Sequence, residues 1–577
     1  MDILQQMQQH LGEDDIRQLK DIYEPTQVAV PDADATNGLC VTREGAIRFY
    51  GDYRRTFPEP EGTSSFPECY IESKDCGLSW KRHIIRQDVL GKSTYIPFMD
   101  KYLGTKVIQG KGFWVRIGDN PDSTEYSQSF IEGNVCDLIP TALVLKKRNR
   151  IILWYAETRP QSCSLPAYFP VVHYSDDGGQ TWKEVHLGEA PFFEVKWPHK
   201  GCRWQQNNRE ITIIEKEDGT LQCFSRTSMD VLYTATSLDG GETWSEFSPS
   251  IFQSTGTFPC AKKLNDGRIV LAFCNTRLLP EVKEANGVWE DFFTNRDANH
   301  IAISEDDGQT WKGFRELRLN PLRNNVDFRS VGGKSNRDKS VHQFEILELP
   351  FNKLLVANGQ HEICRNIMIL DLEWLYETDR EEDLLKGLTN VSTQSYVKSI
   401  AGGWRGEGYI GHCAYNRVSS ALLLPSPENN GKEALHIAPL EDKRLLNGYS
   451  GAVWNFPASK KGKIALRAYL PGKGLRVSLF DYWVNPIDDT VPYFAPFSIV
   501  LRKNMQNDEQ FTTFEITFDC ESKRVTVEAG DYVKLTFPLN GELPHGLHYL
   551  HLQSAVAEND TEGSYVSAWS FESLEKI

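Results

Sequence analysis

Residues 207–244 read NNREITIIEKEDGTLQCFSRTSMDVLYTATSLDGGETW, and this stretch decides the fold. It contains an apolar run, the pair Asp218-Gly219, a second apolar run that ends at Arg226, and the closing residues 237–244. Alternating apolar runs joined by an Asp-Gly pair are typical of two antiparallel strands and a tight turn. We therefore expect a strand, a turn, a second strand and a second turn, in this order.

The closing turn recurs three more times, at Ser73–Trp80, Ser175–Trp182 and Ser304–Trp311. All four copies follow the rule Ser-x-Asp-x-Gly-x-(Thr/Ser)-Trp. In such a turn Asp accepts backbone N–H groups, Gly supplies a positive φ, and Trp packs the turn onto a sheet. Four matches in one chain indicate a repeated structural unit.

These turns resemble the Asp-box motif, and the chain is similar to the sialidase superfamily of β-propellers. The resemblance covers roughly residues 38–420 in fold. It implies an all-β fold with a six-bladed propeller, and seven blades are the alternative. The box residues themselves are expected to be structural, so the function must come from other positions.

The spacing of the boxes predicts the division of the chain. We expect an N-terminal helix and linker at 1–36, the propeller at 37–445 and a β-sandwich at 446–577. The second, third and fourth boxes follow one another at intervals of 62 and 67 residues, whereas the first interval is much longer. Residues 96–134 are therefore expected to be an insertion over the mouth of the propeller, and a blade without a box is the alternative.

The last part of the chain changes its pattern. We expect the fifth blade at 342–376 and the sixth at 409–440, both without a box, with a solvated helical linker at 377–386. From about residue 448, long alternating apolar runs predict an antiparallel sandwich, similar to the jelly-roll or concanavalin-like modules of many carbohydrate enzymes. This module could bind sugar or rigidify the propeller.

The composition narrows the range of partners. The 577 residues carry a formal net charge of −16 and no run rich in Lys or Arg, so we expect neither nucleic acid nor a membrane surface as a partner. The twelve cysteines are scattered without a CxxC pair, so no metal or other cofactor is expected. Residues 1–23 lack the features of a signal peptide, which predicts a cytoplasmic protein, and a helix there could make a homo-oligomer contact.

Three candidate site residues follow from the resemblance. In the sialidase family a glutamate lies nine residues before the Gly of the Asp-Gly turn and an arginine seven after it; Glu210 and Arg226 stand at these distances from Gly219. A second family arginine lies eight residues before the Ser of the fourth-blade box, which is Arg296 here. The resemblance implies that Glu210 polarises a nucleophilic tyrosine and that both arginines clamp a substrate carboxylate. A structural Glu210–Arg226 ion pair is the alternative.

Two other positions depart from the family pattern. The first family arginine is missing at residues 35–37, unless Arg54 or Arg55 takes its place as a substrate contact. The family's acid/base is an aspartate five residues after an arginine, and counting from Arg54 gives Glu59. Glu59 is therefore a candidate to protonate the leaving oxygen.

The nucleophile has two candidate positions. The run GHCAYNRVSSALL resembles the family's nucleophile strand and offers Tyr415, with Arg417 as a further substrate contact. The strand after the fourth box has His342 and Gln343 at the matching positions instead. A histidine that faces the propeller axis could act as a general base or acid near neutral pH.

Together these residues favour an exo-glycosidase that removes a terminal acidic sugar, either sialic acid or a uronic-acid-containing cap, from an oligosaccharide. In this hypothesis Tyr415 attacks the anomeric carbon. A lyase that cleaves rhamnosyl-glucuronate caps, with His342 or Tyr415 as its base, is the first alternative. A non-catalytic sugar-binding propeller is the second.

Overall fold

The structure is a computed structural model that describes most of the chain. The residues outside the description are 1–2, 32–37, 52–68, 86, 109, 136–139, 160–166, 189–190, 192–207, 278–295, 322, 325–340, 360–362, 401–414, 444, 446, 507–509, 531–532 and 576–577, together with the side chains of 158–159, 167, 396–400 and 415–417.

Within the described chain, six antiparallel sheets of four strands each precede the C-terminal part. The first five consist of consecutive strands. They are β2 (Leu39–Val41), β3 (Ile47–Tyr50), β4 (Cys69–Ser73) and β5 (Lys81–Ile84); β6 (Ser93–Ile96), β7 (Lys101–Ile108), β8 (Gly112–Gly118) and β9 (Ser127–Glu132); β10 (Thr141–Leu145), β11 (Arg150–Arg159), β12 (Ala167–Ser175) and β13 (Lys183–His186); β14 (Ile211–Glu215), β15 (Leu221–Ser225), β16 (Val231–Ser237) and β17 (Ser248–Gln253); and β18 (Cys260–Lys263), β19 (Ile269–Phe273), β20 (Ala298–Ser304) and β21 (Lys312–Leu319).

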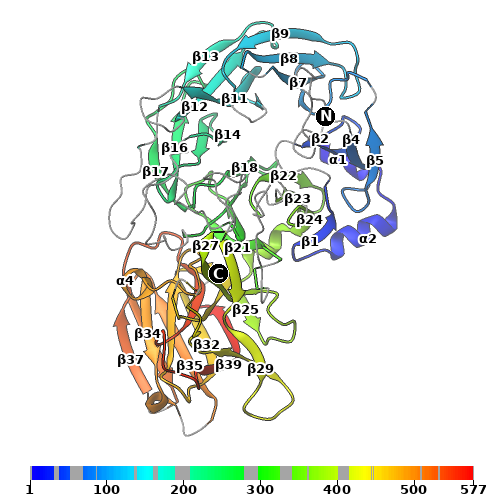
Figure 1. The fold of residues 1–577 in the computed structure, drawn as a ribbon. Helices are drawn as coiled ribbons and strands as arrows, with labels where there is room; N and C mark the ends of the chain where they lie inside the picture. Colours follow the sequence, from blue (N-terminus) through cyan, green and yellow to red (C-terminus); the bar gives the residue numbers. More distant parts are fainter. Residues whose placement is uncertain are drawn as a thin grey trace.

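The sixth sheet joins two distant parts of the chain. Its strands β22 (Phe344–Leu349), β23 (Lys353–Asn358) and β24 (Asn366–Asp371) are extended by β1 (Thr26–Ala29), which pairs with β24. The six sheets follow one another around the upper part of Figure 1. Glu345 of β22 accepts hydrogen bonds from the backbone N–H groups of Gly38 and Leu39, both at 2.6 Å. The sixth sheet is thereby linked to the first.

The four box turns lie between the third and fourth strands of the first, third, fourth and fifth sheets. In each box the Ser hydroxyl donates to the Asp carboxylate and accepts from the Gly N–H, while the Trp indole donates to the Gly carbonyl. Each of these glycines has a positive φ, between 86° and 95°. The expected turn geometry is confirmed in all four copies.

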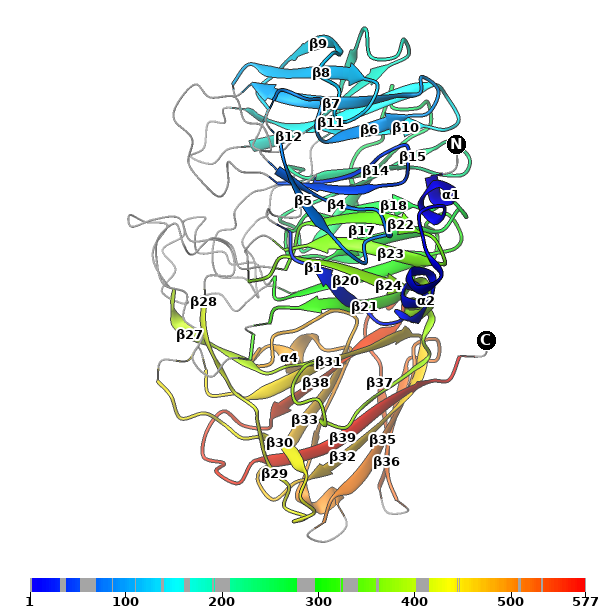
Figure 2. The ribbon, with the colours of Figure 1, turned by 90° about the vertical axis from the view of Figure 1, so that its right-hand side faces the viewer.

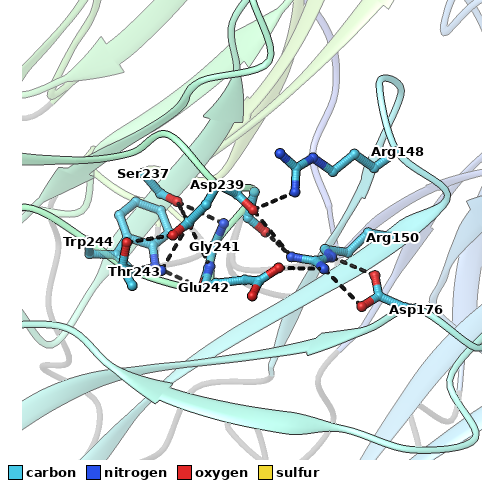
Figure 3. Close-up of polar contacts among 10 residues, drawn as sticks. Arg148, Arg150, Asp176, Ser237, Asp239, Gly241, Glu242, Thr243 and Trp244 are labelled. Atoms are coloured by element: carbon cyan, nitrogen blue, oxygen red, sulfur yellow. Dashed lines mark hydrogen bonds and ion pairs between the residues drawn. The ribbon is translucent and has the colours of Figure 1, made fainter.

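Adjacent boxes are linked by an arginine at the start of β11 (Figure 3). Arg150 donates through Nε to Asp176 of the second box (2.6 Å) and through Nη2 to Glu242 of the third box (2.9 Å). Its Nη1 also donates to the carbonyl of Gly240 (3.0 Å). Polar box residues therefore hold neighbouring sheets together at this end of the strands.

Residues 93–132 form the second sheet, so the expectation of an insertion at 96–134 is wrong. Strand pairing runs without interruption from β6 to β9. The apolar side chains of this sheet, among them Leu103, Phe113 and Val115, pack with Ile151 and Leu153 of the third sheet. The alternative, a sheet that lacks a box, describes this segment.

The segment expected to form the sixth blade, 409–440, belongs elsewhere. A separate two-stranded sheet contains β27 (Gln394–Ile400) and β28 (Tyr415–Ser419). In contrast, β29 (Leu422–Pro425) and β30 (Glu433–Ile437) extend a C-terminal sheet through β39, because Leu435 and Ile437 are buried in the C-terminal core. Residues 379–382 form strand β25 (Asp379–Glu382), which pairs with β39, so the expected helical linker is also wrong.

Two C-terminal sheets share one hydrophobic core. One contains β25, β29, β30, β32 (Lys461–Tyr469), β35 (Thr512–Asp519), β36 (Arg524–Ala529), β37 (Val533–Pro538) and β39 (Ser564–Ser573); the other contains β26 (Val391–Ser392), β31 (Gly451–Ser459), β33 (Leu475–Phe480), β34 (Phe497–Leu501) and β38 (Leu547–Ser554). Nine described strands after residue 448, β31 to β39, make up most of the two sheets. Four strands that precede residue 446 complete the two sheets.

The described helices are short. They are α1 (Ile3–Gln8), α2 (Glu13–Asp21), α4 (Val491–Phe494) and the 3₁₀ turns η3 (Leu372–Tyr376) and η4 (Lys503–Met505). Helices α1 and α2 replace the single N-terminal helix that we expected, and they pack with the first and sixth sheets. Among the described residues, no helix has the length and apolar character of a membrane span.

Candidate functional site

Consecutive strands of each sheet run in opposite directions, and this places the candidate residues at one end of the sheets. In an antiparallel sheet of consecutive strands, the starts of the first and third strands and the end of the second lie at the same end. Glu210 directly precedes β14, Arg226 directly follows β15, and Arg296 lies two residues before the start of β20. His342 lies just before β22. These four residues therefore lie at the end opposite the boxes.

The two faces also differ in what covers them. Helix α1 lies on the box side, where its backbone at Met7 closely approaches Gly45 in the turn between β2 and β3. Figure 2 shows the β27–β28 hairpin on the opposite side of the molecule from α1 and α2. The hairpin thus belongs to the end that carries the candidate site.

Glu210 and Arg226 form a buried ion pair between Oε2 and Nη1, with side chains that are 5% and 4% exposed. The backbone fixes this pair, because the Arg226 N–H donates to the Glu210 carbonyl (3.0 Å) and the Asn208 N–H donates to the Arg226 carbonyl (2.8 Å). Burial raises the pKa of Glu210, but the Arg226 cation outweighs it, with smaller effects of Arg209 and Arg296, so the pKa is lowered. Glu210 is therefore an anion at neutral pH.

Burial lowers the pKa of Arg226 to about 10, which Glu210 opposes and the neighbouring Arg296 and Arg209 reinforce. This guanidinium donates to Glu210 through Nη1. Among the described residues, Nε of Arg226 is buried without a hydrogen-bond partner. The Nε–Nη2 edge has the geometry that binds a carboxylate through two parallel hydrogen bonds.

Arg296 makes a second cluster with His342 and Gln343. Its Nη1 lies 3.0 Å from His342 Nε2, and its Nη2 donates to the Gly256 carbonyl (3.1 Å). Because a guanidinium can only donate, Nε2 accepts and the imidazole carries its proton on Nδ1. Gln343 Nε2 lies 3.4 Å from the same His342 nitrogen. Gln343 has a φ of 74°, a strained backbone conformation of the kind found at ligand sites.

The two clusters are coupled through charge, since Arg296 influences the pKa values of both Glu210 and Arg226. The structure therefore brings together five of the nine sequence candidates: Glu210, Arg226, Arg296, His342 and Gln343. They come from the fourth, fifth and sixth sheets and surround a region rich in arginine. Such a region suits an anionic ligand.

Arg209 is a residue that the sequence argument missed. It precedes Glu210, contributes to the lowered pKa of that carboxyl, and places its guanidinium 4.9 Å from the ring centroid of Tyr168. The chain offers no motif around Arg209 that could have identified it. Its position beside Glu210 was the available signal.

The remaining candidates are not placed by the structure. Arg54 and Glu59 lie outside the described residues, and the backbone alone is described for Tyr415 and Arg417 in β28. The base of the hairpin lies at the site end, because Gln394, which pairs with Ser419, approaches Asp297 (3.5 Å). Tyr415 is four residues farther along β28, a distance of roughly 13 Å in extended chain.

Within the described part of the chain, no group of three or more His, Cys, Asp or Glu side chains is placed to hold a metal ion. The charged groups described at the site are those of the arginines, Glu210 and the buried Asp297. The chemistry that these residues support is anion binding combined with proton transfer by a carboxylate or an imidazole.

Residues 112–352 match the protein family described as BNR repeat-like domain. This part of the chain is therefore similar to BNR-repeat domains. The match extends from the second sheet into the sixth and includes three of the four boxes. The resemblance expected from the repeated turns is confirmed.

Solved structures with some likeness include two of a sialidase from Trypanosoma rangeli. One is a mutant that displays trans-sialidase activity (11% identity, 96% of this chain and 94% of that chain, TM-score 0.32). The other is a complex with sialic acid (10% identity, 96% and 91%, TM-score 0.31). A Dyadobacter fermentans protein of unknown function shares 15% identity over 61% of this chain and 97% of that chain, with a TM-score of 0.34. These likenesses carry no information about activity, and no curated protein matches the sequence.

Proposed function

We propose that this protein is a carbohydrate-active enzyme that binds a sugar carboxylate and removes the terminal acidic sugar of an oligosaccharide as an exo-glycosidase. The observation that carries the proposal is the buried Nε of Arg226, which has no hydrogen-bond partner among the described residues and belongs to a guanidinium whose charge is coupled to that of Arg296. A carboxylate on the Nε–Nη2 edge would gain charge-assisted hydrogen bonds in a site with little water.

The proposed roles follow from this geometry. Arg226 and Arg296 hold the carboxylate, and Glu210 fixes Arg226 and polarises the nucleophile. Tyr415 is the proposed nucleophile and Glu59 the proposed acid, as in the sequence hypothesis. The proposal also includes the architecture: the six sheets are blades of one propeller, and the two C-terminal sheets form a sandwich.

A lyase is the second candidate, favoured by the contact between His342 and Arg296. In a uronate lyase, an arginine that binds the carboxylate acidifies the neighbouring C–H, and a base removes that proton. His342 Nε2 accepts from Arg296 in the unliganded protein. A carboxylate that takes over Arg296 would release this nitrogen to act as the base.

The masses of the reaction products distinguish the two reactions. A panel of sialic-acid-capped and uronate-capped oligosaccharides is incubated with the wild-type protein, with Glu210→Gln and with His342→Gln. Hydrolysis yields products whose summed mass exceeds that of the substrate by one water, whereas elimination yields an unsaturated uronate without added water. We expect hydrolysis that Glu210→Gln abolishes; an unsaturated product lost in His342→Gln would favour the lyase, and no product from any substrate would contradict both.

A further inference from the structure

A polar region lies between the fifth and sixth sheets at the end that carries Arg296 and His342. In the sixth sheet Asn358 pairs with Asn366 across β23 and β24. Side chains two residues apart share one face of a sheet. Asn358 and Asn366 therefore share the face of Val356 and Met368, which pack against the fifth sheet.

The facing surface of the fifth sheet has the same character. Asn299 pairs with Arg318 across β20 and β21, and it shares its face with Ile301, a member of the core between the two sheets. The Arg318 guanidinium interacts electrostatically with Cys364 in the connection between β23 and β24, and burial lowers the pKa of Arg318. The interface between the two sheets thus changes from apolar to amide and guanidinium groups at the site end.

Several polar atoms of these amides are buried without hydrogen bonds, although Asn299 Nδ2 donates to the Val341 carbonyl (2.8 Å). Asn358 and Asn366 are 0% and 1% exposed, and within the described chain neither the oxygen nor the nitrogen of either side-chain amide has a partner. Asn299 Oδ1 and Gln343 Oε1 are likewise buried without a partner there. Each such atom lowers the stability of the fold unless a ligand or water satisfies it. Unsatisfied polar groups concentrated in one place point to a ligand.

We propose that Asn358, Asn366, Asn299 and Gln343 form a subsite for the hydroxyl groups of the bound acidic sugar. This inference rests on the proposed function, because it assigns the polyhydroxylated part of that sugar to the polar region beside Arg296. A side-chain amide offers both a donor and an acceptor, and a sugar hydroxyl requires both. The carboxylate lies on the arginines and the hydroxyls lie on the amides.

The substitution of Asn by Leu separates recognition from stability. Leu has the same number and branching of side-chain heavy atoms as Asn, and the replacement of an unpartnered buried amide by an apolar group is neutral or stabilising. Asn358→Leu/Asn366→Leu should therefore keep or raise the melting temperature. Asn485→Leu, at another buried asparagine in the C-terminal part, controls for effects of the change on ligand binding away from the site, although it also removes the acceptor of the Ile487 N–H (3.0 Å) and should lower the melting temperature.

The experiment is calorimetric titration with three carboxylates. N-Acetylneuraminic acid and methyl glucuronide carry hydroxyls, whereas tetrahydropyran-2-carboxylate has the ring and the carboxylate without them. We expect the double variant to bind whichever hydroxylated acid the wild type prefers about tenfold more weakly and the bare carboxylate with unchanged affinity. Either single variant should lose about threefold, which provides the test if the double variant does not fold.

The outcomes separate the two proposals. If the variants keep the full preference for hydroxylated ligands, the subsite is wrong while the carboxylate site stands. If no carboxylate binds the wild-type protein, or if Arg226→Lys changes none of the affinities, the proposed function is wrong and the subsite falls with it.

Discussion

Arg226 is the residue on which the candidate site depends, and its pairing with Glu210 decides how it can be tested. Both side chains are buried, so Arg226→Ala would leave an unpaired buried carboxylate, a change that typically costs about 3–5 kcal/mol of stability. Loss of activity in that variant would not distinguish unfolding from lost binding. A substitution that keeps the charge is more informative.

Arg226→Lys should preserve the fold but raise the KM for an acidic oligosaccharide at least about tenfold. Lys can pair with Glu210, but it lacks the planar edge that binds a carboxylate through two hydrogen bonds. The measurement is steady-state kinetics beside thermal unfolding. Arg148→Lys, at an arginine on the box side, is the control and should leave the KM unchanged. An unchanged KM in Arg226→Lys would show that Arg226 does not bind the substrate carboxylate.

The candidate residues differ in how far the sequence could place them. Glu210 and Arg226 flank one hairpin in which Ile211 pairs with Ser225, so their contact follows from local register. Arg296 and His342 come from different sheets, and their contact depends on how the fifth and sixth sheets pack. Sequence spacing suggested each of them separately but carried no information about that packing.

At the level of elements, the box turns stabilise the end of the sheets opposite the site. Asp239 accepts from the N–H groups of Glu242 and Thr243 (both 2.9 Å) and from the hydroxyls of Ser237 (2.8 Å) and Thr243 (2.5 Å), as Figure 3 shows. One carboxylate therefore satisfies two backbone donors and orders the whole turn.

Asp239→Ala should lower the free energy of unfolding by about 2–3 kcal/mol, because several charge-assisted hydrogen bonds are lost together. Asp218→Ala, in the β14–β15 turn of the same sheet, removes one backbone contact at 2.8 Å and should cost less than about 1 kcal/mol. Chemical denaturation measures both. Equal losses in the two variants would contradict the structural role of the box.

The two wrong expectations about elements, an insertion at 96–134 and a sixth blade at 409–440, have a common physical cause. The second sheet lacks a box, so its strands carried no repeat signal, although they form the same kind of four-stranded sheet as the others. The strands β29 and β30 alternate in the same way as strands of a propeller blade. Their assignment depends on pairing with β39, more than 100 residues away, and a local pattern contains nothing about that partner.

At the level of the whole molecule, a buried polar cluster joins the fifth sheet to the C-terminal sheets. Tyr549 donates to Glu316 Oε1 (2.7 Å) and also contacts His300, while Asn275 Nδ2 lies 2.8 Å from His548 Nε2. Burial raises the pKa of Glu316 to about 7 and lowers that of His300 to about 3. Both groups therefore favour the neutral form in the folded protein.

Glu316→Gln should stabilise the protein at pH 8 and have little effect at pH 4.5. A carboxyl whose pKa is raised by folding contributes stability that is present below the unfolded value of 4.5 and is lost as the pH rises through about 7. Gln keeps the acceptor for Tyr549 without this loss, so the expected gain at pH 8 is at most about 3 kcal/mol. Thermal unfolding of the wild type and of Glu316→Gln between pH 4.5 and pH 8 tests this prediction. The histidines titrate in both proteins, so their effect cancels when the two are compared at the same pH. A constant difference between them would contradict a raised pKa.

The most direct test of the central claim is the affinity of the wild-type protein for an acidic sugar compared with the carboxamide of the same sugar. The carboxamide keeps the size and all hydroxyls but removes the charge that Arg226 and Arg296 are proposed to bind. Calorimetric titration of N-acetylneuraminic acid and methyl glucuronide against their carboxamides should show at least about tenfold tighter binding of one acid, with the advantage reduced in Arg226→Lys. Equal affinities for acid and carboxamide would contradict a carboxylate site at these arginines.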